Sequence, residues 1–249
     1  MMPAALILAG SRPGRADPVA TAEGVAHKAL VEVEGQPILA RVIAALQDAG
    51  VERIAVAAND SAVVTLSTRL GAEVLPPAAG PSASVGAAFD RLGAPLLVTT
   101  SDHALLQGDW VRRFVEDTPA EADVSLLLAR RETVEAALPG TRRTWLRLAD
   151  GAWSGCNLFL LRTPRARAAI ETWAAVEADR KRPWRIAARL GLGTLLDYAL
   201  GRLGLAQAIA RLGERIGIEA RLVAAHDGRA AIDVDSVQDL ADVRRIAAD

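Results

Sequence analysis

The chain has 249 residues, and its 51% hydrophobic content is enough to build a sizeable core and to exclude wholesale disorder. Its 29 basic and 30 acidic residues nearly cancel, so the chain lacks the basic field that wrapping nucleic acid requires, and we expect no nucleic-acid partner. A single cysteine, Cys156, excludes an intrachain disulfide framework and a multi-cysteine metal site. No run of about 18 apolar residues is free of charge, so we expect no stable membrane insertion and a cytoplasmic location.

The first half of the chain alternates between short apolar runs and amphipathic helical patterns. The apolar runs predict strands over 3–9, 53–58, 72–75 and 94–100, and residues 28–34 alternate as in a strand. Helical spacing predicts helices over 37–49, 61–70 and 82–92. The first run has no basic residues before it, so we interpret it as a buried strand and not as a signal peptide. This alternation predicts an α/β fold with a doubly wound, mostly parallel, Rossmann-like sheet.

The second half of the chain is less regular. We expect a helix over 105–116, strands over 123–129, 144–148, 157–161, 216–224 and 230–234, and a helix that starts at Thr163. Ser236 is placed to cap a last helix, with Asp239 in the capping-box position. Residues 180–215 are basic, apolar and interrupted by glycines, which predicts a helical insertion that acts as a lid or as a contact in a homodimer. Without a linker or a repeat, we expect one domain over 1–249 that contains this insertion.

The loop after the first strand is a candidate phosphate site. Residues 8–15 read LAGSRPGR, in which glycines let backbone N–H groups approach an anion and arginines add charge. The carboxyl end of a strand is also where ligands of open α/β sheets bind. It is not a Walker A loop, because no Gly-Lys-Ser/Thr follows. The alternative is an ordinary turn with solvated arginines.

Lys28 is the second candidate. Among the 29 basic residues it is one of two lysines, and it follows a long polar loop. Against that arginine bias, a lysine indicates a preference for a compact point charge close to a phosphoryl group. The alternative is an exposed lysine at the edge of a strand.

Three carboxylates form the third candidate. Asp102 ends a strongly apolar run, so it lies at the mouth of the predicted sheet, where Mg²⁺ is held by one or two carboxylates and substrate phosphates. Capping of the following helix is the alternative role of Asp102. Asp233 and Asp235 lie two apart on a predicted strand and so share a face, although helix capping by Asp235 or Ser236 explains that segment equally well.

The remaining polar residues give weaker patterns. His27, His103 and His226 are scattered and lack the spacing of metal ligands on a helix, so we do not expect a zinc site. Residues 154–157 (SGCN) have no identifiable base partner, and no Gly-x-Ser-x-Gly motif is present. These patterns do not favour covalent catalysis.

Taken in order, the candidate elements resemble the MobA-like NTP transferases, a family of molybdenum-cofactor guanylyl- and cytidylyltransferase-like enzymes. The matching pieces are 8–10 (LAG) with 12–15, Lys28 with 35–39 (GQPIL), 80–85, Asp102, Asn157, and 232–235 (IDVD) through 239–240. The resemblance implies a glycosyltransferase-A-like α/β fold. It also implies a reaction in which an acceptor phosphate, or a related nucleophile, attacks the α-phosphorus of an NTP and releases pyrophosphate.

The resemblance implies roles for single residues as well. Lys28 and Arg15 would be catalytic and neutralise phosphate charge, while Asp102 and Asp235 would hold Mg²⁺ and Asn157 would face the acceptor. The nucleotide-binding residues would be Leu8, Ala9, Gly10, Ser11, Arg12, Gly14 and Ser84. Because the loop departs from the family's usual Gly-Gly-x-Ser-x-Arg-Met-Gly, either Arg12 or Arg15 takes the phosphate role. The implied partners are an NTP, with CTP or GTP expected, and a small phosphorylated acceptor.

Two other functions compete with this hypothesis. A glycosyltransferase that uses a nucleotide sugar on the same fold would more often show Asp-x-Asp at the end of the central strand, and residues 101–103 (SDH) lack that pattern. A catalytically silent nucleotide-binding protein has no need to retain Lys28, Asp102 and Asp235 together. The hypothesis carried forward is therefore a Mg²⁺-dependent nucleotidyltransferase.

Overall fold

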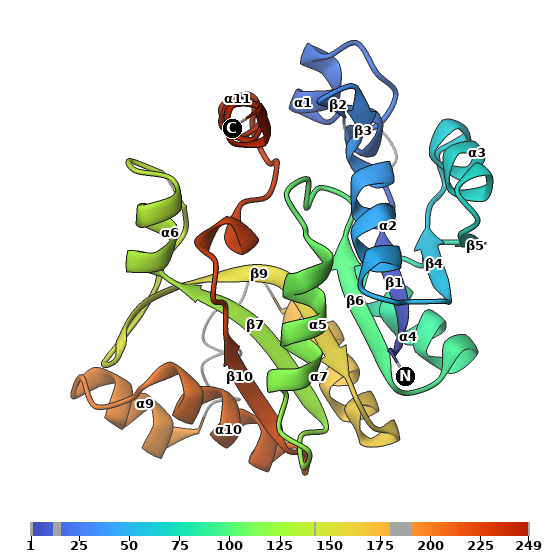
Figure 1. Cartoon of the computed structure of the whole chain (residues 1–249). Coiled ribbons are helices and arrows are strands. Elements are labelled where there is room, and N and C mark those ends of the chain that lie inside the picture. The colour runs from blue at the N-terminus through green and yellow to red at the C-terminus, as the bar shows by residue number, and fades with distance from the viewer. Residues whose placement is uncertain (1, 12–15, 142, 180–190, 249) are drawn as a thin grey trace.

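In a computed structural model, which describes residues 2–11, 16–141, 143–179 and 191–248, the chain folds around one eight-stranded sheet (Figure 1). The strand order is β10-β7-β9-β6-β1-β4-β5, with β8 paired to β9. The strands are β1 (Ala4–Leu8), β4 (Ile54–Ala57), β5 (Glu73–Leu75), β6 (Leu96–Thr100), β7 (Val124–Arg130), β8 (Leu146–Leu148), β9 (Gly151–Leu161) and β10 (Ala220–Ala224). A separate two-stranded ribbon pairs β2 (Glu32–Val33) with β3 (Gln36–Pro37).

The sheet is mixed and mostly parallel. Strands β6, β1, β4 and β5 pair in parallel, as do β10 and β7, whereas β9 runs antiparallel to both β6 and β7. The α/β class and the mostly parallel sheet predicted from the sequence are confirmed. The antiparallel β9 joins the two parallel parts, so it enters the middle of the sheet from the opposite direction.

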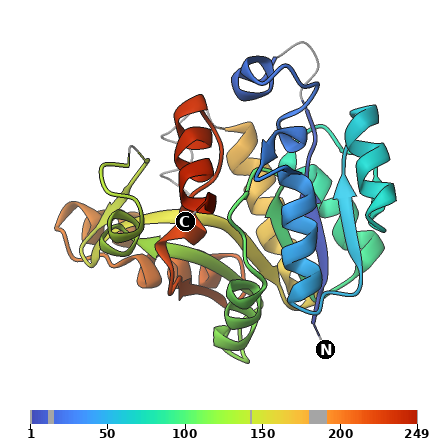
Figure 2. The same cartoon turned by 45° about the horizontal axis from the view of Figure 1, so that its top comes forward.

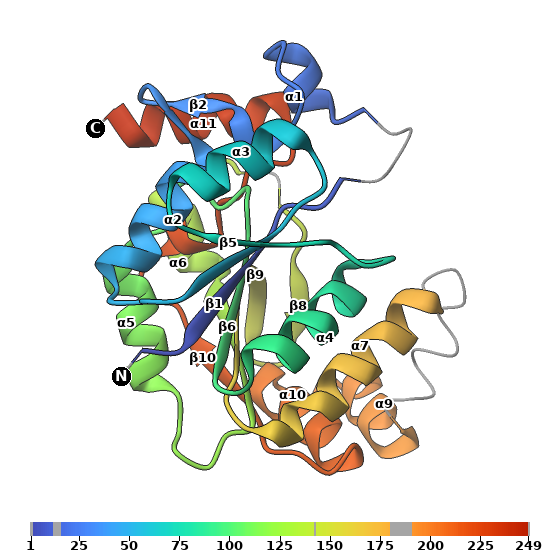
Figure 3. The same cartoon turned by 90° about the vertical axis from the view of Figure 1, so that its right-hand side faces the viewer.

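Helices cover both faces of the sheet. In Figures 1 and 3, α2, α3, α5 and α6 lie on one face and α4, α7 and α10 on the other. The helices are α1 (Pro18–Ala22), α2 (Ile38–Asp48), α3 (Ser61–Arg69), α4 (Pro81–Leu92), α5 (Gly108–Asp117), α6 (Arg131–Ala137), α7 (Arg167–Ala178), α9 (Leu192–Ala199), α10 (Leu205–Arg215) and α11 (Val237–Ala248). Single 3₁₀ turns form at η1 (Lys28–Leu30), η2 (Pro164–Ala166) and η3 (Gly228–Ala231).

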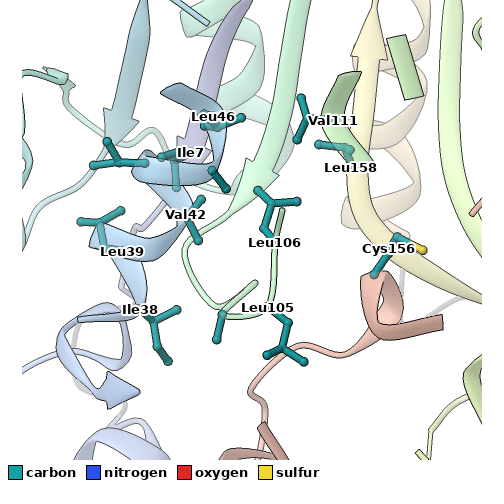
Figure 4. Close-up of a cluster of buried hydrophobic side chains, with 14 of the residues drawn as sticks. Ile7, Ile38, Leu39, Val42, Leu46, Leu105, Leu106, Val111, Cys156 and Leu158 are labelled. Atoms are coloured by element: carbon teal, nitrogen blue, oxygen red, sulfur yellow. The ribbon is translucent and has the colours of Figure 1, made fainter. Parts of the chain in front are cut away.

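The core beside β1 shows how the sequence pattern fixes this arrangement. Ile38, Leu39, Val42 and Leu46 recur at helical spacing in α2, and all four are fully buried against the sheet face that carries Ile7 (Figure 4). Each side chain of this size contributes about 1.5–3 kcal/mol when it is removed from water. Because α2 also packs against η1, the same contacts hold the segment that carries Lys28 close to the end of β1.

The carboxyl ends of three parallel strands meet at one edge of the sheet, at the top of Figure 1. Leu8 in β1 is in register with Ala57 in β4 and with Thr100 in β6. Two positions after these three aligned residues, the chain carries Gly10, Asn59 and Asp102, respectively after β1, β4 and β6. Parallel register alone therefore brings these three residues to the same edge, where α/β sheets bind their ligands.

Two predicted strands are turns in the structure. Residues 28–30 form η1, because the His27 side chain accepts the Ala29 N–H and caps a 3₁₀ turn, and only Glu32–Val33 is extended. The predicted strand over 230–234 is replaced by η3 and a short extended connection. Asp227 caps η3 through the Arg229 N–H, and the Val234 N–H donates to the Asp102 carbonyl oxygen instead of to a neighbouring strand.

The start of α11 settles which residue caps the last helix. Ser236 Oγ accepts the Asp239 N–H at 3.2 Å and donates to Asp239 Oδ2 at 2.7 Å. Asp235 directs its carboxylate elsewhere, and only its backbone N–H contacts Asp239. The predicted cap by Ser236 is confirmed, but Asp239 returns its hydrogen bonds to the Ser236 hydroxyl and the Asp235 N–H and not to the Ser236 N–H of a full capping box. The Asp235 carboxylate is left available for another role.

The predicted insertion over 180–215 is described only from residue 191 onward. Its described part holds α9 and α10, and α10 packs against β10 with Leu205 and Gly213 buried. Its role as a lid or dimer contact stays a prediction. Among the residues that the structure describes, no helix is long and apolar enough to cross a membrane.

The loop that carries Asp233 and Asp235 depends on a close approach between η3 and α6, which lie beside each other in Figure 2. A Cβ on Gly228 would overlap the backbone carbonyl of Thr133, which cannot move without shifting the helix. We expect Gly228→Ala to lower the free energy of unfolding by about 1–3 kcal/mol, as overpacking does. Gly155→Ala is the matched control, because nothing lies within 4 Å of its Cβ position. Urea unfolding of both variants tests this, and equal stabilities would contradict it.

Candidate functional site

A cleft with two hollows opens at the carboxyl edge of the sheet. The two hollows share Leu8, Gly10, Ser11 and Thr100, so they meet at the end of β1 and β6. The first has a volume of about 760 Å³ and is bounded by residues 77–81 and by Trp173. The second has a volume of about 690 Å³ and is bounded by 16–18, 26–28, Asp102 and Asp235. Both volumes lie in the range of small-molecule sites.

Lys28 joins two carboxylates at the floor of the second hollow. Its Nζ lies 2.8 Å from Asp102 Oδ2 and 3.1 Å from Asp235 Oδ1. Burial disfavours the charged ammonium, but the two carboxylates outweigh burial, so the pKa of Lys28 lies well above its usual range. The repulsion expected between two neighbouring carboxylates is thus relieved by this lysine. Three segments far apart in the sequence meet at one nitrogen atom.

Asp102 is held in a fixed position and stays ionised. Burial alone would raise its pKa, but Lys28 and the hydrogen bond from Thr100 Oγ1 lower it below the usual value. The Asp102 side chain is 15% exposed, whereas that of Asp235 is 71% exposed. His103, the next residue, is buried and burial lowers its pKa to about 4, so it adds no charge at neutral pH. The Asp102–Lys28 pair is therefore the buried part of the site and Asp235 its solvent-exposed part.

Asp233 does not share a face with Asp235, contrary to the sequence-based expectation. It pairs with Arg143 Nη2 and accepts a hydrogen bond from Asn157 Nδ2 at 2.7 Å. Burial and the nearby Asp235 and Asp102 raise the pKa of Asp233 despite its arginine partner. Each Asp233 oxygen thus has a partner, and Asp233 orients Asn157, whereas Asp102 and Asp235 are the two of these carboxylates that line the second hollow.

Asn157 reaches this position through an irregularity in β9. The pairing of β7 with β9 shifts between Leu126 and Leu128, opposite residues 155–159, and Asn157 adopts a φ of 48°. Such a bulge re-aims a side chain beside a site, and asparagine tolerates the left-handed region better than most residues. Asn157 consequently lines the first hollow, although it lies inside a strand and not at its end.

Asn59 braces the loop that follows β1, and the sequence analysis did not identify it. Its Oδ1 accepts the Ser11 N–H at 3.0 Å, and its Nδ2 donates to the Ser11 carbonyl oxygen at 3.2 Å. On the other side, a Cβ on Gly10 would lie 3.1 Å from Pro77, so the chain passes there with little room. The sequence signal that could have identified Asn59 is its position just after the apolar run of β4, at the carboxyl end of that strand.

Ser84 contributes to the first hollow by supporting its wall. Its hydroxyl accepts the Ala78 N–H at 2.9 Å and donates to the Gly80 carbonyl oxygen at 2.9 Å. The residue is 6% exposed and lines the hollow from the first turns of α4. With both hydrogen bonds made inside the protein, its direct effect is to fix the conformation of residues 78–80.

Other predicted nucleotide-binding residues are only partly described. Leu8, Gly10 and Ser11 line both hollows and Ala9 lines the second. Arg12, Gly14 and Arg15 lie outside the described residues. In the described ranges, no group of three or more His, Cys, Asp or Glu residues could hold a metal by itself.

The carboxylates present nevertheless fit a Mg²⁺ ion bound together with a nucleotide. Mg²⁺ usually takes one or two protein carboxylates and completes its shell with water and substrate phosphates. Asp102 and Asp235 supply that number, and both contact the same Lys28 nitrogen. Their oxygens are therefore nearer to each other than the roughly 8 Å beyond which a shared Mg²⁺ would be too far even through bridging water.

Comparisons with known proteins agree with this geometry. A family model described as "MobA-like NTP transferase domain" matches residues 5–181. A hypothetical transferase from Thermus thermophilus is similar to this chain with 33% identity and a TM-score of 0.82, over 96% of this chain and 100% of that one. The chain is therefore an enzyme of the nucleotidyltransferase class. It belongs to the family of MobA-like NTP transferases.

More distant solved structures share the fold. The 2-C-methyl-D-erythritol 4-phosphate cytidylyltransferase from Thermus thermophilus is 16% identical with a TM-score of 0.56, over 100% of both chains. A CMP:2-keto-3-deoxy-manno-octonic acid synthetase complexed with CTP is 19% identical with a TM-score of 0.60, over 100% of this chain and 99% of that one. No curated protein matches the chain.

Removal of the Lys28 charge provides a test of the ion cluster. Lys28→Met leaves Asp102 buried without a cation, so we expect the free energy of unfolding to fall by about 3 kcal/mol at pH 7. This value is at the lower end for a broken buried ion pair, because Asp235 is exposed to water. The lowered pKa of Asp102 means that its stabilising effect is present above the unfolded value, about 3.9, and is lost as pH falls through the folded value. The raised pKa of Lys28 keeps its charge through this range.

The stability difference between wild type and Lys28→Met should consequently shrink as pH falls. The decrease begins above about 4, because without Lys28 burial raises the pKa of Asp102 in the variant, and it continues below about 4, where wild type loses the contribution of its ionised Asp102. Urea unfolding from pH 7 down to pH 3 measures it, with Lys28→Arg as the variant that keeps a cation. A difference independent of pH would show that Lys28 acts through packing and not through its charge.

Proposed function

We propose that this enzyme transfers a nucleoside monophosphate from an NTP to a small phosphorylated acceptor in a Mg²⁺-dependent reaction. An acceptor phosphate oxygen forms a bond to the α-phosphorus, the bond from that phosphorus to the bridging oxygen breaks, and pyrophosphate leaves. The observation that carries the proposal is the cluster of Lys28, Asp102 and Asp235 at the floor of a cleft that begins at Gly10. The nucleotidyltransferase family of the chain supports the reaction class.

The division of the cleft supports an assignment of its two hollows. The first is lined largely by apolar groups, the backbone of 77–80 and Trp173, which suits a flat base. The second contains the charged cluster, which suits the phosphates. Gly10 and Ser11 lie between them, where a nucleotide spanning both hollows would pass close to the backbone. CTP and GTP are the donors that the resemblance to this family implies, and one neighbour of the same fold is a complex with CTP.

The charge of the second hollow favours entry of an NTP together with a divalent cation. In the described part of its wall, this hollow has one cation, Lys28, and three carboxylates, Asp17, Asp102 and Asp235, so the wall is net negative. A bare triphosphate would be repelled, and Mg²⁺ held by Asp102 and Asp235 would reverse the local charge. Once bound, the cation would supply charge neutralisation at the phosphates.

The protein's own groups then position the reactants. Lys28, drawn toward the nucleotide, neutralises negative charge on the α- and leaving phosphates, and this type of electrostatic effect dominates phosphoryl transfer. Asn157 lies in the part of the first hollow beside Thr100, which both hollows share, because the next residue, Leu158, pairs with Thr99. Its Nδ2 is used on Asp233, so its Oδ1, a hydrogen-bond acceptor, can orient a hydroxyl of the acceptor at this junction. No covalent nucleophile is required.

Lys28→Ala should lower turnover by about 10² or more, comparable to the loss of other electrostatic stabilisers. Lys28→Arg should recover only part of the activity, because the planar guanidinium is bulkier and cannot occupy the same point between two carboxylates. Pyrophosphate release measures the effect, with an acceptor taken from a panel of phosphorylated sugars, alcohols and cofactor precursors. Wild-type turnover in Lys28→Ala would contradict the catalytic role.

The metal assignment is tested by titration of Mg²⁺ in the same assay. Asp102→Asn should abolish Mg²⁺-dependent transfer, and Asp235→Asn should raise the Mg²⁺ concentration needed for half-maximal activity, because a neutral amide binds Mg²⁺ less well than a carboxylate. Asp227→Asn is the control, since Asp227 is a carboxylate that caps η3 and does not line the cleft. Unchanged Mg²⁺ dependence in both site variants would place the metal elsewhere. Turnover of nucleotide sugars alone would favour a glycosyltransferase.

A further inference from the structure

His27 lies beside Lys28 in the wall of the second hollow, and its hydrogen bonding fixes where its proton is. Its Nδ1 accepts the Ala29 N–H at 3.0 Å and thereby caps η1. A backbone N–H can only donate, so Nδ1 must carry a lone pair. The ring is then neutral with its single N–H at Nε2, and burial agrees with this because it lowers the pKa of His27.

The Nε2–H has no partner among the described residues. The carboxylates near the ring, Asp17, Asp60 and Asp102, act on it only at longer range. Asp17 and Asp60 are occupied in capping α1 and α3, and Asp102 is bound to Lys28 and Thr100. His27 is half-buried and lines the second hollow, so its Nε2–H, a donor of fixed tautomer without a partner in the described part of the chain, is available to a ligand bound there.

Such a donor meets a need that the rest of the hollow leaves open. Lys28, the single cation in the described wall, already contacts two carboxylates. A polyphosphate carries more oxygens than one shared ammonium can serve, and each oxygen that leaves water needs a replacement donor. A neutral imidazole N–H provides this without adding a further charge to an already crowded ion cluster.

We infer that His27 is a substrate-binding residue whose Nε2–H donates to a phosphate oxygen of the NTP, in the part that leaves as pyrophosphate. The inference rests on the proposed function. His27 lines the second hollow and not the first, so it meets the phosphate chain and not the base. Within that hollow we assign it to the terminal phosphates, because the neighbouring Lys28 already serves the α-phosphate.

Two substitutions distinguish the roles of the two ring nitrogen atoms of His27. In His27→Asn, the side-chain oxygen can replace Nδ1 as the cap of η1, since asparagine is a favourable N-cap residue, but nothing replaces the Nε2–H. In His27→Gln, the longer amide can replace the Nε2–H, but the cap is lost. His27→Asn should therefore keep its stability and lose ligand affinity, whereas His27→Gln should lose stability and keep ligand affinity.

The experiment measures thermal stability and the affinity for CTP, GTP, ATP, UTP and the four matching monophosphates by calorimetry with Mg²⁺. We expect His27→Asn to keep the wild-type Tm and to bind the preferred NTP at least about tenfold more weakly, as for a lost hydrogen bond to a charged group, while its affinity for the monophosphate is unchanged. His27→Gln should lose about 2–4 °C in Tm and retain most of its NTP affinity.

The outcomes distinguish this inference from the proposed function. If wild type binds none of the four NTPs with Mg²⁺, the proposed function fails. If wild type binds an NTP and His27→Asn binds it equally well, His27 only caps η1 and the inference is overturned. It is also overturned if His27→Asn weakens NTP and monophosphate to the same extent, because His27 would then act on the α-phosphate or through the fold.

Discussion

The ammonium group of Lys28, placed between Asp102 and Asp235, is the interaction on which the site depends. It joins residues 74 and 207 positions away in the sequence, so η1, the end of β6 and the segment before the last helix are tied at one point. Without a cation, two carboxylates at this distance would repel, and Asp102 would take up a proton more readily or the exposed Asp235 side chain would turn away. The hydrophobic core and the hydrogen bond from the Val234 N–H to the Asp102 carbonyl oxygen bring these segments together, and the charge interaction holds the two carboxylates side by side.

Much of the site could be predicted because one rule governs parallel sheets. Gly10 and Asp102 were identified from the sequence since each follows an apolar strand, and the register of Leu8 with Thr100 brings them together. The same rule applies to Asn59, which follows β4, yet it was missed. Residues 59–61 (NDS) have the composition of a helix start, and that local signal concealed a long-range hydrogen bond to Ser11.

The features that the sequence could not give are those that depend on distant partners. Lys28 begins a 3₁₀ turn because a ring nitrogen of the preceding residue, His27, caps that turn, whereas the alternating apolar pattern of 28–34 favoured a strand. Asp233 and Asp235 differ in their partners. Asp233 contacts Arg143, 90 residues away, and Asn157, whereas Asp235 contacts Lys28. Residue spacing alone treats the two carboxylates as equivalent.

The antiparallel course of β9 gives the two sides of the cleft different tolerance to insertions. Gly10, Asn59 and Asp102 stand on loops that begin where strands end, so added residues farther along those loops leave the sheet untouched. Asn157 instead stands in the bulge of β9, between residues 153–155, which pair with β7, and residues 158–161, which pair with β6 and include partners of β7. Insertions can therefore reshape the contacts of the loop-built side without touching the sheet, whereas a change of length beside Asn157 must be absorbed by the bulge or must shift the pairing of 153–155 with β7.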